Sequence, residues 1–510
     1  MPSESVQTHM TSSDDSKLPS SLLARLLAPR NLAVFVFLVL PLSLIFLVLI
    51  WWFARQNIAA QELADRKNEL LASGLPIDAE SLLDYRRERI DSSRSQEWQR
   101  ILDEIESDAF QESGEDVPII GLAYEEEPEE YVYGQPYSNH LVARNYLSEW
   151  SGLLQRIHLI TEGSRGVWTP MTTYDLLPRI GPTRDVSRLL RLEFDDALRR
   201  DDFDHATHCV LALIGNSRAL EEEPMAVSQL VSVAILEFAL DAIKTALQID
   251  CFDDEQWRAV LEQLEGLEEI EPRYRRFLVG ERAWVLPLFR DPTSMEELGG
   301  EAIEYQLPGG HSIDALETLA MYDRLELVPT DDLTIFFEEI ESLETSVQAS
   351  FQSRSWLRKL DTQITEVTMP SLVSMNQAFV RSAMHVRLAK TAILARLFQH
   401  REGRWPSTIQ EIHDAAPGLL SSGDENGNLT IGSLAPMGDR PFGLKVDQDE
   451  LVLWGFEPDS VTAATPVEPP TGQDFIDADA EYAPMLADSY LQRWLWNLPT
   501  DGLAELPPSN

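Results

Sequence analysis

Two histidines have the spacing in this sequence that best suits metal chemistry. His205 and His208 lie three residues apart, and Asp204 and Cys209 stand beside them. On a helix, positions i and i+3 share a face, and imidazole, thiolate and carboxylate groups all bind divalent metals. A complete site needs a third or fourth ligand from elsewhere in the chain, which the local sequence does not supply. The alternative stays open that these side chains cap a turn and pack in a core.

Four acidic pairs test the sequence for an all-helical prenyl-transfer enzyme. In that fold, carboxylates at i, i+1 and i+4 hold magnesium on a pyrophosphate. The third acidic residue is missing in every case, since Arg199 follows Asp195-Asp196, His205 follows Asp201-Asp202, Trp257 follows Asp253-Asp254 and Ile335 follows Asp331-Asp332. The sequence therefore does not support this enzyme class.

Two further segments imitate functional motifs. Gly215–Ala219 resembles a nucleophile elbow, but it falls inside a predicted helix rather than between a strand and a helix. Asp424–Asn428 resembles the opening of a calcium loop, but Ala435 stands where a bidentate Glu is required. The sequence has no phosphate-binding Gly loop, no H-E-x-x-H and no paired C-x-x-C. We therefore assign no catalytic, cofactor-binding or metal-binding residue and no cofactor.

The histidines belong to a run of amphipathic helices predicted from Asn139 to Gln248. Within it, Val186–Leu220 reads as two helices separated by the polar turn Asp201–Asp204. Glu223-Pro224 starts a third helix, and Asp253-Asp254 caps a fourth. No fixed repeat period is visible, so the pattern favours an irregular helical bundle over a repeat array.

Leu32–Phe53 is the segment around which the rest of the chain is organised. Its 22 uncharged residues would form a helix of about 33 Å, enough to cross a hydrocarbon core of about 30 Å. Trp51, Trp52 and Phe53 crowd one end, as in an interfacial aromatic belt. A cleaved signal peptide would have a shorter apolar region and a better cleavage site than Ile58-Ala59-Ala60. We expect an uncleaved single span, with the lipid bilayer as a partner through Leu32 to Phe53.

The charges flanking this span do not fix its orientation. The positive-inside count is a tie, with Lys17, Arg25 and Arg30 before the span and Arg55, Arg66 and Lys67 after it. Because a first hydrophobic segment commonly leaves its short tail in the cytoplasm, we expect a cytoplasmic N-terminus and an extracytoplasmic body.

The composition excludes one class of partner and leaves the cysteines undecided. The chain has 85 acidic and 41 basic side chains and a formal net charge of -44, which repels nucleic acid and anionic lipid surfaces. The two cysteines, Cys209 and Cys251, are expected either to pair in an exported domain or to remain buried thiols.

Further secondary structure is predicted on both sides of the bundle. Ala54–Ser73 continues the membrane helix, Asp78–Glu112 forms a second helix, and Glu125–Glu130 is a solvated loop. Pro329-Thr330-Asp331 opens another helix, and Met369-Pro370 opens the longest. Short strands are expected at Leu429–Ile431, Phe442–Val446 and Leu451–Phe456, of which the last two form a hairpin across Asp447–Glu450. The aromatic cluster Tyr490–Trp496 docks on the body or contacts a partner or membrane surface.

One stretch carries a family resemblance. It comprises the Ala- and Leu-rich helix Ala389–Phe398, the motif Gly403–Ile412, the segment Pro436–Phe442 and the ending Gly455–Asp459. This arrangement resembles the C-terminal module of single-span proteins of planctomycete bacteria, which is distantly similar to the soluble part of type II secretion pseudopilins. Asp204–Arg290 also resembles the middle of that group. The resemblance implies a membrane-anchored protein and is silent on chemistry. The sequence lacks a pseudopilin processing site before Leu32 and a calcium-binding loop after Gly455.

The sequence thus predicts a mainly α protein with one N-terminal transmembrane helix, an irregular helical bundle and a small C-terminal α+β module with a short β-hairpin. The expected regions are a disordered cytoplasmic tail (1–30), the span (31–53), a membrane-proximal helical region (54–135), the bundle (136–368), a long helix with the β module (369–460) and a Pro- and Asp-rich tail (461–510). A structural or protein-interaction role in the cell envelope is the leading hypothesis. The alternatives are an enzyme or metal-binding protein whose site is assembled from distant residues, and an accessory of a secretion-type assembly.

Overall fold

The computed structural model describes residues 40–89, 92–121, 139–162, 179–289, 310–359, 361–420, 442–447, 450–454 and 495–499. Several predicted features lie outside these residues: the tail 1–30, the first part of the span at Leu32–Val39, the loop Glu125–Glu130, the segments Asp424–Asn428 and Leu429–Ile431, and residues 461–494.

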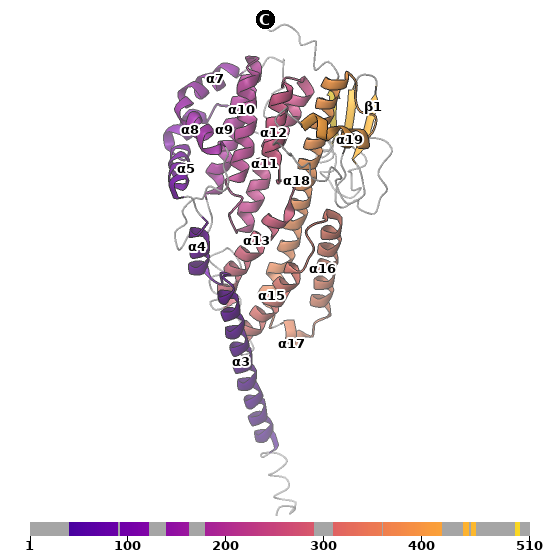
Figure 1. The fold of residues 1–510 in the computed structure, drawn as a ribbon. Coiled ribbons are helices and arrows are strands. Elements are labelled where there is room, and N and C mark those ends of the chain that lie inside the picture. Colours follow the sequence, from indigo (N-terminus) through magenta and orange to yellow (C-terminus); the bar gives the residue numbers. More distant parts are fainter. Residues whose placement is uncertain are drawn as a thin grey trace, which may run out of the picture.

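Within the described residues the chain is mainly helical, as predicted, with one small sheet (Figure 1). The helices are α3 (Leu40–Ala72), α4 (Ala79–Arg87), α5 (Ser92–Ile105), α6 (Asp108–Gly114), α7 (His140–Glu149), α8 (Ser151–Thr161), α9 (Ile180–Arg199), α10 (Phe203–Arg218), α11 (Ala226–Ile249), α12 (Asp254–Leu264), α13 (Ile270–Val285), the 3-10 turn η3 (Leu286–Phe289), α15 (Gly310–Glu326), α16 (Leu333–Ser353), α17 (Trp356–Lys359), α18 (Gln363–Glu402) and α19 (Ile409–Leu420). The strands are β1 (Gly443–Asp447), β2 (Glu450–Trp454) and β3 (Leu495–Pro499).

Helix α3 joins the apolar segment to the body as one continuous helix of 33 residues. Its residues from Leu40 to Phe53 are exposed apart from the half-buried Trp52, and this part projects from the lower end of the body in Figure 1. Beyond it, Leu63 and Leu70 lie in an apolar cluster with residues of α15 and η3. The predicted continuation of the apolar helix is therefore confirmed, and α3 is long and apolar enough to cross a membrane.

The single helix predicted over Asp78–Glu112 is wrong, because the structure has three shorter helices there, α4, α5 and α6. Asp78 starts α4 in a reciprocal capping box with Ser81. Ser107 lies inside the predicted helix, yet its hydroxyl accepts a hydrogen bond from the Phe110 amide at 3.3 Å and starts α6. A Ser side chain that bonds nearby amides competes with helix continuation, which a count of apolar periods does not detect.

The bundle is built from helical hairpins in the order that the sequence predicts. Helix α9 packs on α10, α10 on α11, and α11 on α18. The turn between α9 and α10 is tight because Asp201 adopts a left-handed conformation, with φ of 52°, and the Asp202 side chain accepts a hydrogen bond from the His205 amide at 3.3 Å. Gly215 lies inside α10, and a Cβ there would approach the Thr161 carbonyl oxygen of α8 to 2.3 Å. The glycine is therefore required for packing, and its position inside α10 agrees with the prediction that this segment is helical.

Helix α18 is the longest of the described helices, with 40 residues, but it does not start at Met369-Pro370 as predicted. It starts at Gln363, so Pro370 lies inside it. The reason is a contact with a different helix: the Asp314 carboxylate of α15 accepts hydrogen bonds from the amides of Ile364 at 2.8 Å and Thr365 at 3.2 Å. A cap supplied by another element stabilises a helix start without a local sequence signal.

The predicted hairpin is confirmed as β1 and β2, which pair antiparallel, with Asp447 opposite Glu450. A third strand, β3, pairs antiparallel with β2 and comes from the C-terminal aromatic segment. Its Trp496 and Leu498 are buried in the main core, so this part of the segment docks on the body. The fully buried Arg396 of α18 fixes the strand, since it donates to the carbonyls of Leu247 in α11 and Pro499 in β3, both at 2.8 Å.

Candidate metal centre

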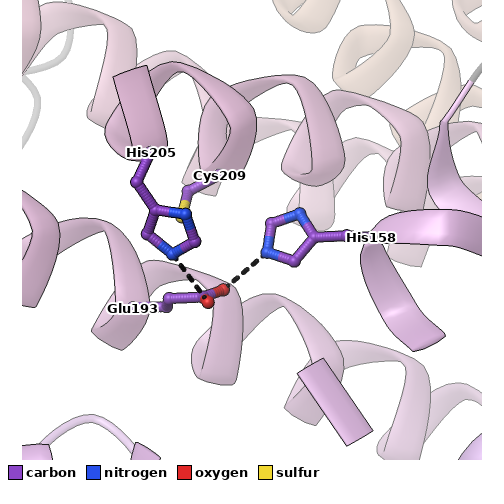
Figure 2. Close-up of side chains that lie close together, drawn as sticks. All are labelled: His158, Glu193, His205 and Cys209. Carbon is purple, nitrogen blue, oxygen red and sulfur yellow. Dashed lines mark hydrogen bonds and ion pairs between the residues drawn. The ribbon is translucent and has the colours of Figure 1, made fainter. Parts of the chain in front are cut away.

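Four potential metal ligands meet at the N-terminal side of the bundle. They are His158 from α8, Glu193 from α9, and His205 and Cys209 from α10. Their ligand atoms all lie within 4.8 Å of one another, and Figure 2 shows both imidazole rings turned toward the Glu193 carboxylate. The part of the chain that the structure describes contains no second cluster of this kind.

The three helices present these side chains because of their local sequence. Glu193 lies among the buried apolar residues of α9, so its carboxylate is directed into the helix interface. On α10, His205 and Cys209 are four residues apart and therefore project from one face. His158 lies in the last turn of α8, next to the buried Ile157.

Hydrogen bonds hold the cluster together. The Nε2 atom of His158 lies 2.8 Å from Oε2 of Glu193, and Nε2 of His205 lies 2.9 Å from Oε1 of the same carboxylate. The two ring centroids are 5.8 Å apart. The Cys209 residue is fully buried, and the exposed fractions of the side chains of Glu193, His158 and His205 are 10%, 21% and 35%. The cluster is thus closed on the thiol side and reaches water through His205.

The electrostatics centre on the negative charge of Glu193. Burial opposes this charge, but the hydrogen bonds from His158 and His205 outweigh it and lower the pKa of Glu193 to about 2. The hydrogen bond to Glu193 raises the pKa of His205, against a smaller effect of burial. Burial, together with the nearby Glu193, raises the pKa of the Cys209 thiol well above its usual value. The site therefore holds a carboxylate that attracts positive charge, whether protons or a metal ion.

This donor set fits a zinc ion. Around a tetrahedral Zn²⁺ with bonds of about 2.0–2.3 Å, the ligand atoms are about 3.3–3.8 Å apart, and the separations within the cluster bracket this range. Two neutral imidazoles, one thiolate and one carboxylate would also cancel the charge of the ion, which favours its burial. Only a short movement of each side chain would bring its ligand atom into such a geometry.

The sequence assigns no metal ligand, but two of the residues considered for their spacing belong to this cluster. Of the residues proposed from spacing, the structure brings His205 and Cys209 together, but it excludes His208 and Asp204. The ring of His208 is exposed, and its Nδ1 lies 2.8 Å from the Asp204 carbonyl oxygen of its own helix. Sequence reasoning missed His158 and Glu193. A signal for Glu193 was present, because a carboxylate on the apolar face of a helix is seldom buried without a partner.

Three residues of the acidic pairs considered at the sequence level have arginine partners in the described part of the chain. Asp195, Asp196 and Asp202 of the acidic pairs form ion pairs with arginines, Asp195 with Arg191 at 3.1 Å among them. Cys209 and Cys251 are both free thiols, so the disulfide alternative is not realised in the structure. Comparison of the chain with protein-family models, with curated proteins and with solved structures finds no match.

Proposed function

We propose that this chain is a membrane-anchored protein whose helical body holds one Zn²⁺ ion through His158, Glu193, His205 and Cys209. The observation that carries the metal site is the meeting of four donor atoms from three helices within 4.8 Å. The exposed apolar part of α3 supports the anchor.

A structural role for the ion fits better than a catalytic one. Catalytic zinc usually keeps one coordination position open for water or substrate, whereas structural zinc takes four protein ligands. Here four ligands are available, and their helices would be cross-linked by the ion. Zinc would replace the protons that now bridge His158, His205 and Glu193.

The topology and partners extend this proposal. We place the N-terminus in the cytoplasm and the body outside it, where a structural or interaction role in the envelope accords with the wide apolar helix faces of the sequence. The resemblance to planctomycete single-span proteins supports the same placement. Cross-linking in native cells, followed by mass spectrometry of the detergent-purified protein, tests for an envelope partner at near-equal amount.

The metal site is tested on the full-length protein in detergent, after removal of metal with a chelator. Titration with Zn²⁺ should saturate at one equivalent. Titration with Co²⁺ should give the visible absorption of tetrahedral cobalt together with a thiolate-to-cobalt charge-transfer band. Cys209→Ala should abolish the charge-transfer band, whereas Cys251→Ala should retain it.

A second matched pair guards against misfolding of the buried-cysteine variant. His205→Asn changes a partly exposed ligand, and His208→Asn changes its exposed neighbour. Loss of a group that only hydrogen-bonds a metal ligand costs about 10–100-fold in metal affinity, so loss of the ligand His205 itself should weaken zinc binding by more than that. Equal zinc affinity in wild type, His205→Asn and Cys209→Ala would show that the cluster is only a buried carboxylate neutralised by imidazoles.

A further inference from the structure

One corner of the body lies at the level where α3 loses contact with it. Arg55, two residues after the exposed Phe53, forms an ion pair with Asp361. Asp361 follows α17 by two residues, and Figure 1 shows α17 at the lower end of the body, where the apolar part of α3 emerges. At 1.5 Å rise per residue, Phe53 and Arg55 differ by only about 3 Å along the helix. Helix α17 therefore lies close to the plane where the exposed apolar surface begins.

The residues of this corner are basic in a strongly acidic chain. We call Ser353–Lys359 the basic corner, since it contains three basic residues, Arg354, Arg358 and Lys359. The whole stretch from Ser346 to Leu360 contains no Asp or Glu, although the chain as a whole has a net charge of -44.

The local charges are not cancelled within the body. Arg354 and Arg358 share one carboxylate, that of Glu317 in α15, with Arg358 at 2.9 Å. The Arg358 side chain is nevertheless 60% exposed. Lys359 is exposed as well, and no carboxylate among the described residues lies within ion-pair distance of it. The corner therefore has two arginines that share one carboxylate and an additional exposed lysine, which leaves an excess of positive charge.

We infer that the basic corner rests on the headgroup layer of the bilayer that α3 spans, with Arg358 and Lys359 contacting lipid phosphates. This inference depends on the membrane anchor of the proposed function. A surface this close to the end of the apolar helix lies within reach of the headgroups, and each Lys or Arg near an anionic surface strengthens association by about fivefold. The rest of the acidic body is repelled from the same lipids, so the corner also sets which side of the body faces the membrane.

The test uses the full-length protein with Cys251→Ser, reconstituted into phosphatidylcholine nanodiscs with and without phosphatidylglycerol. A fluorescent probe is attached at one of three engineered cysteines. Ser355→Cys reports on the basic corner, Leu47→Cys on the exposed part of α3, and Asp414→Cys on α19 at the far end of the body. Headgroup and acyl-chain nitroxide lipids serve as quenchers.

Headgroup quenching at position 355, but not at position 414, is the expected result, with more quenching when phosphatidylglycerol is present. The double change Arg358→Gln and Lys359→Gln removes two charges, each of which contributes about fivefold. In anionic lipid it should therefore lower the ratio of molecules with a membrane-bound corner to those with a free corner by about 25-fold. Acyl-chain quenching at position 47 without headgroup quenching at position 355 would overturn this inference and leave the anchor intact. No quenching at position 47 would overturn the anchor, and the inference with it.

Discussion

The most apolar 18-residue windows of helices α3 and α11 have nearly the same mean hydropathy, and both helices are long enough to cross a membrane, yet the structure gives them opposite surroundings. In the most apolar 18-residue window of each helix, 6% of α3 is buried in the protein and 56% of α11. Helix α11 packs against α9, α10, α13, α18 and β3, whereas the apolar half of α3 projects beyond the body. Apolar composition alone therefore does not distinguish a core helix from a membrane anchor.

The polar residues of the two helices do distinguish them. In α11, the fully buried Gln229 donates to the carbonyls of Leu220 and Glu221, both at 3.1 Å, and Ser232 donates to the Ser217 carbonyl at 2.7 Å. In the exposed part of α3, the Ser43 hydroxyl donates a hydrogen bond to the Leu40 carbonyl of its own helix, at 2.9 Å. Polar side chains of α11 form hydrogen bonds with other elements of the core. The Ser43 hydroxyl of α3 bonds within its own helix, a pattern that is compatible with a membrane-spanning helix.

The largest predicted difference comes from equal truncations in the two helices. Leu236 of α11 is fully buried, so Leu236→Ala should lower the free energy of unfolding of the body by about 2–5 kcal/mol. The matched change Leu47→Ala in α3 should leave it unchanged, since Leu47 is 62% exposed. Urea unfolding in detergent, followed by far-ultraviolet circular dichroism, measures both. Equal losses would mean that α3 packs on the body along its whole length.

A smaller loss is expected from the buried polar contacts of α11. Gln229→Leu should cost about 1–3 kcal/mol of unfolding free energy, because buried carbonyls before α11 would lose their donor. Ser43→Ala is the control in α3 and should change nothing in the same urea titration. A stability gain in Gln229→Leu would show that these carbonyls find other donors.

The junction between α3 and the body should respond more weakly. Arg55→Ala removes the partner of the Asp361 carboxylate, which is only 6% exposed, and should cost about 1 kcal/mol. Arg87→Ala, which breaks a pair with both side chains exposed, serves as the control in the same thermal unfolding series. If Arg55→Ala matches the control, the Arg55–Asp361 pair does not contribute to holding α3 on the body.

The smallest predicted effect is a pH dependence of stability that arises at the C-terminal end of α11. His400 of α18 bonds Asp250, the C-cap of α11, at 2.9 Å and Asp254 of α12 at 2.8 Å, and Arg396 also faces Asp250 at 3.3 Å. The hydrogen bond to Asp250 raises the pKa of His400, against burial. Because the pKa of His400 is higher in the folded protein than its ordinary value of about 6.5, protonated His400 stabilises the fold at pH values below about 6.5. This contribution is lost as pH rises through the pKa of His400 in the folded protein.

The free energy of unfolding of the wild type should therefore fall by up to about 1 kcal/mol relative to that of His400→Gln as pH rises from acidic to alkaline. His413→Gln changes an exposed side chain and serves as the control. Its urea midpoint should vary with pH in the same way as that of the wild type. A wild-type advantage over His400→Gln that grows with pH would contradict a raised pKa for His400 in the folded protein.

Local patterns predicted much of the fold, and the spacing of His205 and Cys209 drew attention to the candidate site without assigning it. The turn at Asp201–Asp204, the cap at Asp253 and the β1–β2 hairpin follow from neighbouring residues. The start of α18 could not be predicted in this way, because Asp314 caps it from another helix. Likewise β3 pairs with a strand about forty residues earlier, and His158 and Glu193 reach the cluster only through packing. Contacts between distant residues leave no periodic signal.

The length of α18 gives the molecule a fixed dimension. The helix starts beside Asp361, at the end of the body where α3 emerges, and finishes at Gly403 near the sheet. Its 40 residues correspond to about 60 Å of helix. With α3 anchored in a bilayer, the continuous helix would separate the β-sheet end from the lipid-facing end of the body by up to about 60 Å.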